Sequence, residues 1–300
     1  MINGLAPAFP TPFMTSVLRR RPHQLAAVAL SIFLVVAVGC TGLLQNFGAR
    51  WVTRQIAAEF NFDEAQTAAT RASVDRLIAA APGALSTKVD MLVATVDAAI
   101  AKGLTEKKLL GMERQVDALL DIIAGAIIDE AAPILATLRD DQIDFVEARI
   151  QTRLDQARKE LAEPKEERLV KRQDEFVEAV EDWADSLTEA QEKALREFVA
   201  GLPDEAAARL EADERRLATV AAVFRKHPGA QAIRDAIWKE WKSRENWGPN
   251  ARPPQARRAE GRQALLFVYG LLDSNQKDHA SEHLHELHDK VKAFFGAAGT

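Results

Sequence analysis

Residues 187–191 read Leu-Thr-Glu-Ala-Gln (LTEAQ), and this five-residue pattern recurs along the chain. The other copies are FDEAQ at 62–66, LDSNQ at 272–276 and a degenerate LRDDQ at 138–142. Thr or Asp in second place can accept a hydrogen bond from the first helical turn, while Gln three residues later reaches back to the cap amide. Each copy therefore predicts a helix start. The residues assigned to this capping motif are Asp63, Gln66, Gln142, Thr188, Gln191, Asp273 and Gln276.

Helical proteins commonly reuse capping boxes, and that is one explanation of the recurrence. However, the last position is Gln in every copy, although the chain holds 44 Asp and Glu residues. The preference for Gln over Glu is more than chance predicts, so a further role for the motif stays open.

Apolar residues recur at helical spacing between these motifs. The composition, 47% hydrophobic and 28% charged with one Tyr, also favours helix over strand. Together they predict an all-α fold, an elongated multi-helix bundle. The first expected helix is Trp51–Ala81, ended by Pro82-Gly83, and two more follow, one up to Gly103 and one up to Pro133. A long helix from Ile143 to Trp183, kinked at Pro164, comes next. Three shorter helices are expected over 188–200, 204–226 and 229–246, then a loop at 247–254 and one or two helices over 256–295.

The N-terminal region resembles a bacterial lipoprotein signal. Arg19 to Arg21 form a charged segment, Leu25 to Val38 an apolar one, and Ala37-Val38-Gly39-Cys40 the lipobox. Cleavage before Cys40, the only cysteine, and acylation of its thiol would anchor the remaining chain to a membrane. The predicted organisation is a signal peptide at 1–39 with Met14 as the expected true start, a lipidated tether at 40–50, and a helical periplasmic domain at 51–300, either one unit or two lobes joined near 183–190.

Two alternatives to lipidation stay open. Leu25 to Leu44 is an uncharged stretch of about the 20 residues that span a bilayer, so the segment could remain as a signal anchor. Cleavage after Gly39 could instead release a soluble product, but that leaves a free thiol unexplained. If Cys40 is lipidated, Thr41 replaces the Asp that favours inner-membrane retention, and the outer membrane is the expected location.

Charge and motifs argue against several functions. The formal net charge of −5 is unlike that of a nucleic-acid-binding protein. The sequence holds no G-x-S-x-G nucleophile motif and no Gly-rich phosphate loop, so a non-enzymatic protein is expected. Trp238, Trp241 and Trp247 could bind a ligand such as a glycan, but the two that are three residues apart, Trp238 and Trp241, are expected to serve as core anchors.

Four of the six histidines lie in DHASEHLHELHDK, residues 278–290. His279 and His283 are four residues apart on one helix face, and His285 and His288 are three apart. Such pairs can hold Zn²⁺ or a similar divalent ion if a third ligand joins them. The alternative is an exposed polar helix face without metal.

LTEAQ and LDSNQ resemble the LTxxQ motif of the Spy and CpxP family of periplasmic chaperones and envelope-stress proteins. The longer pattern resembles an uncharacterised family of Gram-negative lipoproteins, with a Trp before FDxxQ at 51–66, LxxxQ at 138–142, a Trp before LTxxQ at 183–191, and LxxxQ at 272–276. These resemblances imply a periplasmic helical lipoprotein, whose expected partners are a membrane and envelope protein clients. A metal-responsive or metal-buffering role is the alternative.

Overall fold

A computed structural model describes the backbone of residues 43–298 and the side chains of residues 48–296. The described part of the chain forms ten α-helices and no strand, so the predicted all-α, multi-helix fold is confirmed. The helices are α3 (Leu43–Phe60), α4 (Glu64–Lys102), α5 (Glu106–Leu135), α6 (Asp140–Leu161), α7 (Lys165–Ala184), α8 (Glu189–Ala200), α9 (Ala206–Phe224), α10 (Ala230–Lys242), α11 (Pro254–Leu271) and α12 (Ser274–Ala298).

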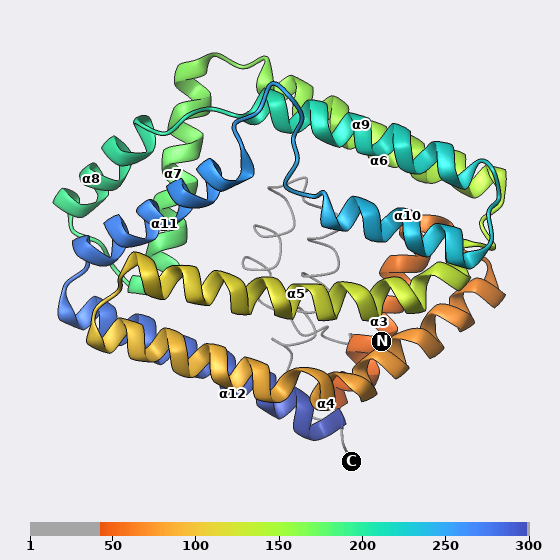
Figure 1. Cartoon of the computed structure of the whole chain (residues 1–300), viewed down its shortest axis with the longest axis horizontal. Coiled ribbons are helices and arrows are strands. Elements are labelled where there is room, and N and C mark those ends of the chain that lie inside the picture. Colours follow the sequence, from red (N-terminus) through yellow and green to blue (C-terminus); the bar gives the residue numbers. More distant parts are fainter. Residues whose placement is uncertain (1–42, 299–300) are drawn as a thin grey trace, which may run out of the picture.

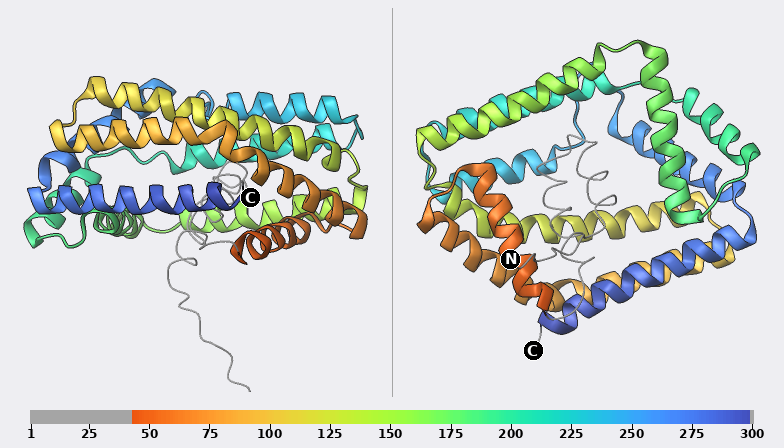
Figure 2. Two further views of the ribbon diagram at one scale, coloured as in Figure 1. Left: turned by 90° about the horizontal axis from the view of Figure 1, so that it is seen from below. Right: turned by 180° about the vertical axis from the view of Figure 1, so that it is seen from behind.

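The helices form the sides of a closed frame (Figure 1). One edge holds α4, α5 and α12, and the opposite edge holds α6 and α9. At one end lie α7, α8 and α11, and at the other α3 and the first part of α4; the view from behind shows the same sides (Figure 2). Neighbours pack mainly in pairs, such as α6 with α9 and α7 with α8. A pair of amphipathic helices buries one apolar stripe from each member.

The apolar core is divided accordingly into small clusters along the frame. One cluster lies between α4, α5 and the end of α12, and includes Leu85, Ile123 and Phe294. Others join α3 to α4, join α7 to α8 with partly buried side chains of α11, and join the end of α4 to the start of α5. Polar contacts between helix ends therefore have a larger part in holding this frame than in a bundle with one core.

The predicted helix end at Pro82-Gly83 is wrong. Pro82-Gly83 does not end a helix, because Pro82 lies inside α4, and the helix that contains Trp51 ends at Phe60 instead. A proline in a helix interior removes one backbone hydrogen bond and produces a bend, and α4 is bent (Figure 1). The helix continues because both halves are packed, Ile78 against α3 and Leu85 against α5 and α12.

Most of the other boundaries lie close to those expected. Gly103 ends α4 with a φ of 94°. The single long helix expected from Ile143 to Trp183 is wrong, because it is two helices, α6 and α7, with Pro164 as the N-cap residue of α7. Residues 243–253 link α10 to α11 and include the expected loop from Trp247, and two helices follow it. In the predicted alternative of two lobes, the junction near 183–190 corresponds to the connection between α7 and α8.

Candidate functional site

Two of the motif glutamines, from the starts of α4 and α6, bind each other. Gln66 Nε2 donates to Gln142 Oε1 at 3.1 Å, and Gln142 Nε2 donates to Gln66 Oε1 at 2.6 Å. Each amide also donates to a backbone carbonyl just before the other helix, Gln66 to Thr137 O at 3.1 Å and Gln142 to Asn61 O at 2.7 Å. Gln142 is 0% exposed and Gln66 6%. We name this pair the first glutamine clasp.

The starts of α8 and α12 repeat the arrangement. Gln191 Nε2 donates to Gln276 Oε1 at 2.7 Å, and Gln276 Nε2 donates to Gln191 Oε1 at 3.1 Å. Their other amide hydrogens reach Leu271 O at 2.9 Å and Ser186 O at 2.7 Å. Both side chains are buried. This pair is the second glutamine clasp.

Each clasp glutamine also completes its own helix cap. Its Oε1 accepts from the cap amide three residues earlier, and the four caps are Asp63 (3.1 Å), Arg139 (3.1 Å), Thr188 (2.9 Å) and Asp273 (3.0 Å). The amide oxygen thus accepts from its cap and from its clasp partner, while the NH₂ group donates to the partner oxygen and to a backbone carbonyl. This uses the full hydrogen-bonding capacity of the amide. Glutamate could satisfy the cap but could not donate to a partner carbonyl. The clasps therefore explain why the motif holds Gln.

The Arg in the degenerate copy has a partner across the first clasp. Arg139 Nη1 lies 2.9 Å from Asp63 Oδ2, so the cap carboxylate of α4 is paired with the cap residue of α6. The backbone hydrogen bond from Gln66 and the contact with Arg139 hold the pKa of Asp63 below its ordinary value. Clasp and ion pair together fix two helix ends that are more than 70 residues apart in the chain.

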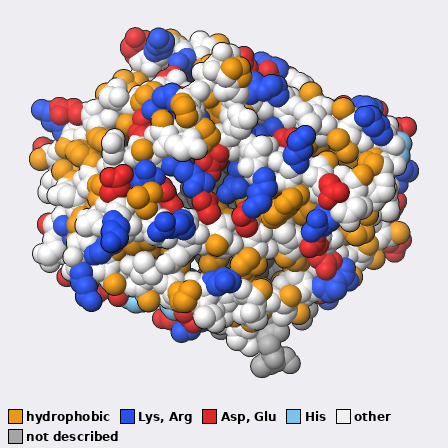
Figure 3. All heavy atoms as spheres, in the orientation of Figure 1, with side chains coloured by type: hydrophobic (Ala, Val, Ile, Leu, Met, Phe, Trp, Pro, Cys, Tyr) orange, Lys and Arg blue, Asp and Glu red, His pale blue; other side chains and the backbone are white. Residues whose placement is uncertain are grey.

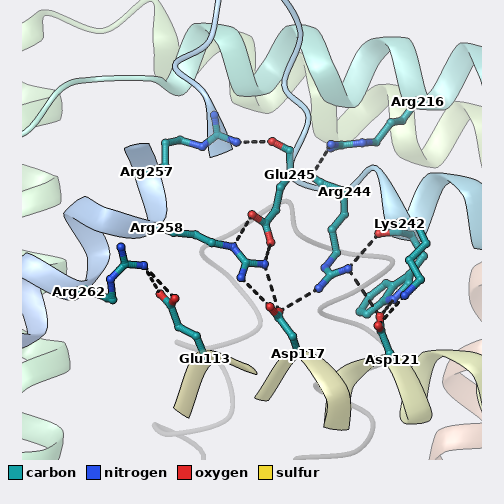
Figure 4. Close-up of polar contacts among 11 residues, drawn as sticks. Glu113, Asp117, Asp121, Arg216, Lys242, Arg244, Glu245, Arg257, Arg258 and Arg262 are labelled. Atoms are coloured by element: carbon teal, nitrogen blue, oxygen red, sulfur yellow. Dashed lines mark hydrogen bonds and ion pairs between the residues drawn. The ribbon is translucent and has the colours of Figure 1, made fainter. Parts of the chain in front are cut away.

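A second polar cluster joins α5 to α10 and α11 (Figure 4). Glu113, Asp117 and Asp121 are four residues apart and so share one face of α5. The three shortest ion pairs to them are Glu113–Arg262 at 2.9 Å, Asp117–Arg258 at 2.6 Å and Asp121–Lys242 at 2.6 Å. We name the whole cluster the arginine–carboxylate network: Glu113, Asp117, Asp121, Lys242, Arg244, Glu245, Arg258 and Arg262.

Arg258 connects three elements in this network. Beyond Asp117 on α5, it binds the Glu245 carboxylate after α10, with Nε 2.7 Å from Oε2. Hydrogen bonds to Glu245 and Asp117 raise the pKa of Arg258 above its ordinary value. Figure 3 shows cationic and acidic side chains gathered near the centre of the face seen in Figure 1. A guanidinium held by two carboxylates has fixed geometry, which suits a structural joint.

The tryptophans lie beside cations. Trp241 Nε1 donates to Asp121 Oδ1 at 2.8 Å, and the Arg244 guanidinium lies 4.2 Å from the Trp241 ring centre. Arg257 lies 4.0 Å from the ring centre of Trp247. Burial raises the pKa of Asp121, but hydrogen bonds from Lys242 and Trp241 outweigh it, so this pKa lies below its ordinary value. Such a carboxylate stays ionised and is poorly suited to act as a general acid.

Replacing Arg258 by alanine should lower the free energy of unfolding by about 2 kcal/mol, because it leaves two partly buried carboxylates without their shared partner. Arg258→Lys should lose less, since an ammonium keeps the charge but not the two-sided geometry. Urea denaturation measures both. The control is Lys193→Ala, whose exposed pair with Glu197 at 3.9 Å should contribute at most about 0.5 kcal/mol. Equal losses for Arg258→Ala and Lys193→Ala would contradict a structural role for the network.

The four histidines of α12 do not share one site. His288 Nε2 lies 2.7 Å from Asp90 Oδ1 and His285 Nε2 lies 3.2 Å from Asp97 Oδ1, both on α4, while His283 packs edge-on against Trp183 of α7. His279 lies one turn before His283. Within residues 48–296, no group of three or more His, Cys, Asp or Glu side chains is arranged to hold a metal ion. Zinc binding here stays a prediction.

A cavity of about 420 Å³ lies beside α9. Four carboxylates line it, and each has a partner: Asp204 with Arg168, Glu205 with Arg252, Glu211 with Asn250, and Glu214 with Arg158. The cavity therefore offers no free acidic group for chemistry.

Cys40 and the predicted signal peptide lie outside the described residues.

A family model matches residues 83–252, more than half of the chain. It is described as a family of unknown function (DUF6279). The chain belongs to the DUF6279 family. No curated protein and no solved structure matches the chain. The DUF6279 match includes Gln142 and Gln191, one member of each clasp, while their partners Gln66 and Gln276 lie outside it.

The arginine–carboxylate network was missed from the sequence. The sequence pattern did not assign these charges to a cluster, and the structure pairs them across α5, α10 and α11. The available signal was the four-residue spacing of Glu113, Asp117 and Asp121, matched by Arg258 and Arg262 four residues apart. Spacing indicates that residues share a helix face and does not indicate which helix covers that face.

Proposed function

We propose that this DUF6279 member is a lipid-anchored periplasmic protein, more specifically of the outer membrane, that binds envelope proteins in a chaperone-like manner without enzymatic chemistry. The lipobox around Cys40 and the Thr41 that follows it support the location. The resemblance of LTEAQ and LDSNQ to the LTxxQ motif supports the chaperone-like role.

The observation that carries this proposal is the combination of side chains on α5 and α11. Both helices contribute to the arginine–carboxylate network, and both also expose large apolar side chains: Leu110 (40%), Val116 (39%) and Leu265 (55%). Exposed apolar side chains next to paired charges can bind many different unfolded segments, because hydrophobic contact does not require a particular client sequence. The network carboxylates are engaged by cations, which favours binding over acid–base catalysis.

The mature lipoprotein in lipid nanodiscs should suppress aggregation of an unfolded model client at an equimolar ratio, measured by light scattering. Leu110→Ser combined with Leu265→Ser should lower this suppression several-fold, since it removes two exposed apolar contacts. Val170→Ser is the matched control, because Val170 is 51% exposed on α7. An absence of suppression by the unaltered protein, or an equal loss in the control, would count against the proposal.

A further inference from the structure

One face of α4 is exposed on both sides of its bend. Its members recur at helical spacing and are small or apolar apart from Thr87 and Lys88: Ala79, Ala80, Gly83, Ala84, Thr87, Lys88, Met91 and Ala94, with Met91 54% exposed. Neither α3, α5 nor α12 covers this face, although all three pack against α4. Among the described helices, α4 alone is long and apolar enough, by length and composition, to cross a membrane, yet little of that stretch is buried.

The bend of α4 lies beside the start of α3. These helices form a hairpin around Phe62, and packing of Ala49 and Val52 against Val74 and Ile78 shows that they run antiparallel. The start of α3 at Leu43 is about 9 Å further along its helix from Ala49, at 1.5 Å per residue. It therefore approaches the part of α4 that follows Ile78. Figures 1 and 2 both show the start of α3 near the corner that the bend of α4 forms.

The predicted lipid anchor on Cys40 would bring a membrane surface close to this corner. Cys40 precedes Leu43 by three residues, and three residues span at most about 10 Å. A diacylglyceryl group on Cys40 would therefore hold the α3–α4 corner close to the bilayer. We infer that the exposed face of α4 rests on the membrane surface beside the anchor. This inference depends on the lipid anchor of the proposed function.

Exposed cations on α3 and α4 fit an anionic phospholipid surface. Lys88 lies within the exposed face, and Arg50 and Arg54 are exposed one turn apart on α3. None of the three forms an ion pair with another described residue. Basic side chains near a bilayer are attracted to anionic headgroups. The apolar face is modest in area, but the short tether gives it a high effective concentration at the membrane, so a weak contact is sufficient.

A fluorescent probe on α4 tests this contact in the full lipidated chain. Because the Cys40 thiol would be acylated, Ala84→Cys introduces the one free thiol, which is labelled with an environment-sensitive dye. The protein is bound to vesicles of phosphatidylethanolamine and phosphatidylglycerol that contain a lipid with a nitroxide near its headgroup. The matched control is Ala218→Cys on α9, which is also an exposed alanine but lies on the opposite edge of the frame.

Quenching should be several-fold stronger at position 84 than at 218. Met91→Cys should behave like Ala84→Cys, and adding Lys88→Glu should reduce quenching at 84. Vesicle flotation separates the two proposals: protein that floats but shows equal quenching at 84 and 218 overturns the α4 contact and leaves the anchor intact. Protein that does not float overturns both. Pyrene excimer emission from position 84 would assign the face to a second copy of the chain and overturn the membrane contact.

Discussion

Replacing Gln142 by alanine should lower the free energy of unfolding by about 3 kcal/mol. The side chain is 0% exposed and links both helix ends of the first clasp. Its loss removes the buried clasp partner of Gln66, although Gln66 keeps its contacts with Thr137 and Asp63. Asn61 O loses this donor, and Arg139 N loses its acceptor. Unsatisfied buried polar groups cost more than an average hydrogen bond contributes, which is why the effect is large. Urea denaturation followed by circular dichroism measures it.

Three further variants make this test specific. Gln156→Ala, on the exposed face of the same helix, should change stability by less than about 0.5 kcal/mol. Gln142→Glu should be at least as damaging as alanine, because its carboxylate would face Asn61 O and Gln66 Oε1, which are both acceptors. In a double-mutant cycle, Gln66→Ala and Gln142→Ala should be strongly non-additive. Equal stability of Gln142→Ala and Gln156→Ala would refute the clasp.

Replacing Cys40 by serine should abolish lipid attachment completely. The unaltered protein should incorporate radiolabelled palmitate, whereas Cys40→Ser should incorporate none and should keep its signal peptide, because the proposed lipid anchor is attached to this thiol. The chain holds no second cysteine that could substitute. Fluorography and the mass of the purified product measure the two effects.

Thr41→Ser is the matched control, since it changes a hydroxyl residue next to Cys40 without removing the thiol. It should be labelled like the unaltered protein and fractionate with the membrane. An unlabelled wild-type protein that remains membrane-bound at its full mass would favour the signal anchor instead. Recovery of unlabelled protein in a soluble periplasmic fraction would favour the cleaved, lipid-free product.

The helices were largely readable from the sequence because their determinants are local. The caps at Asp63 and Thr188, the glycine at position 103 and the periodic apolar stripes each act within a few residues. Two prolines are exceptions: Pro164 separates two helices where one kinked helix was predicted, and at Pro82 the local rule predicts an end that does not occur. Packing of Ile78 and Leu85 on opposite sides of that proline carries the helix through it, and packing is not a local property.

The sequence by itself determined the helical class, the helix starts and the unusual demand for Gln at the third helical position, since backbone capping depends on neighbouring residues alone. Only the tertiary structure decided which glutamine binds which, and that Arg258 joins α11 to α5. These contacts link residues 76 to 141 positions apart, so they depend on how the whole chain closes into a frame. Hydrogen bonds and ion pairs of this kind specify partners by geometry, and geometry exists only once the helices have packed.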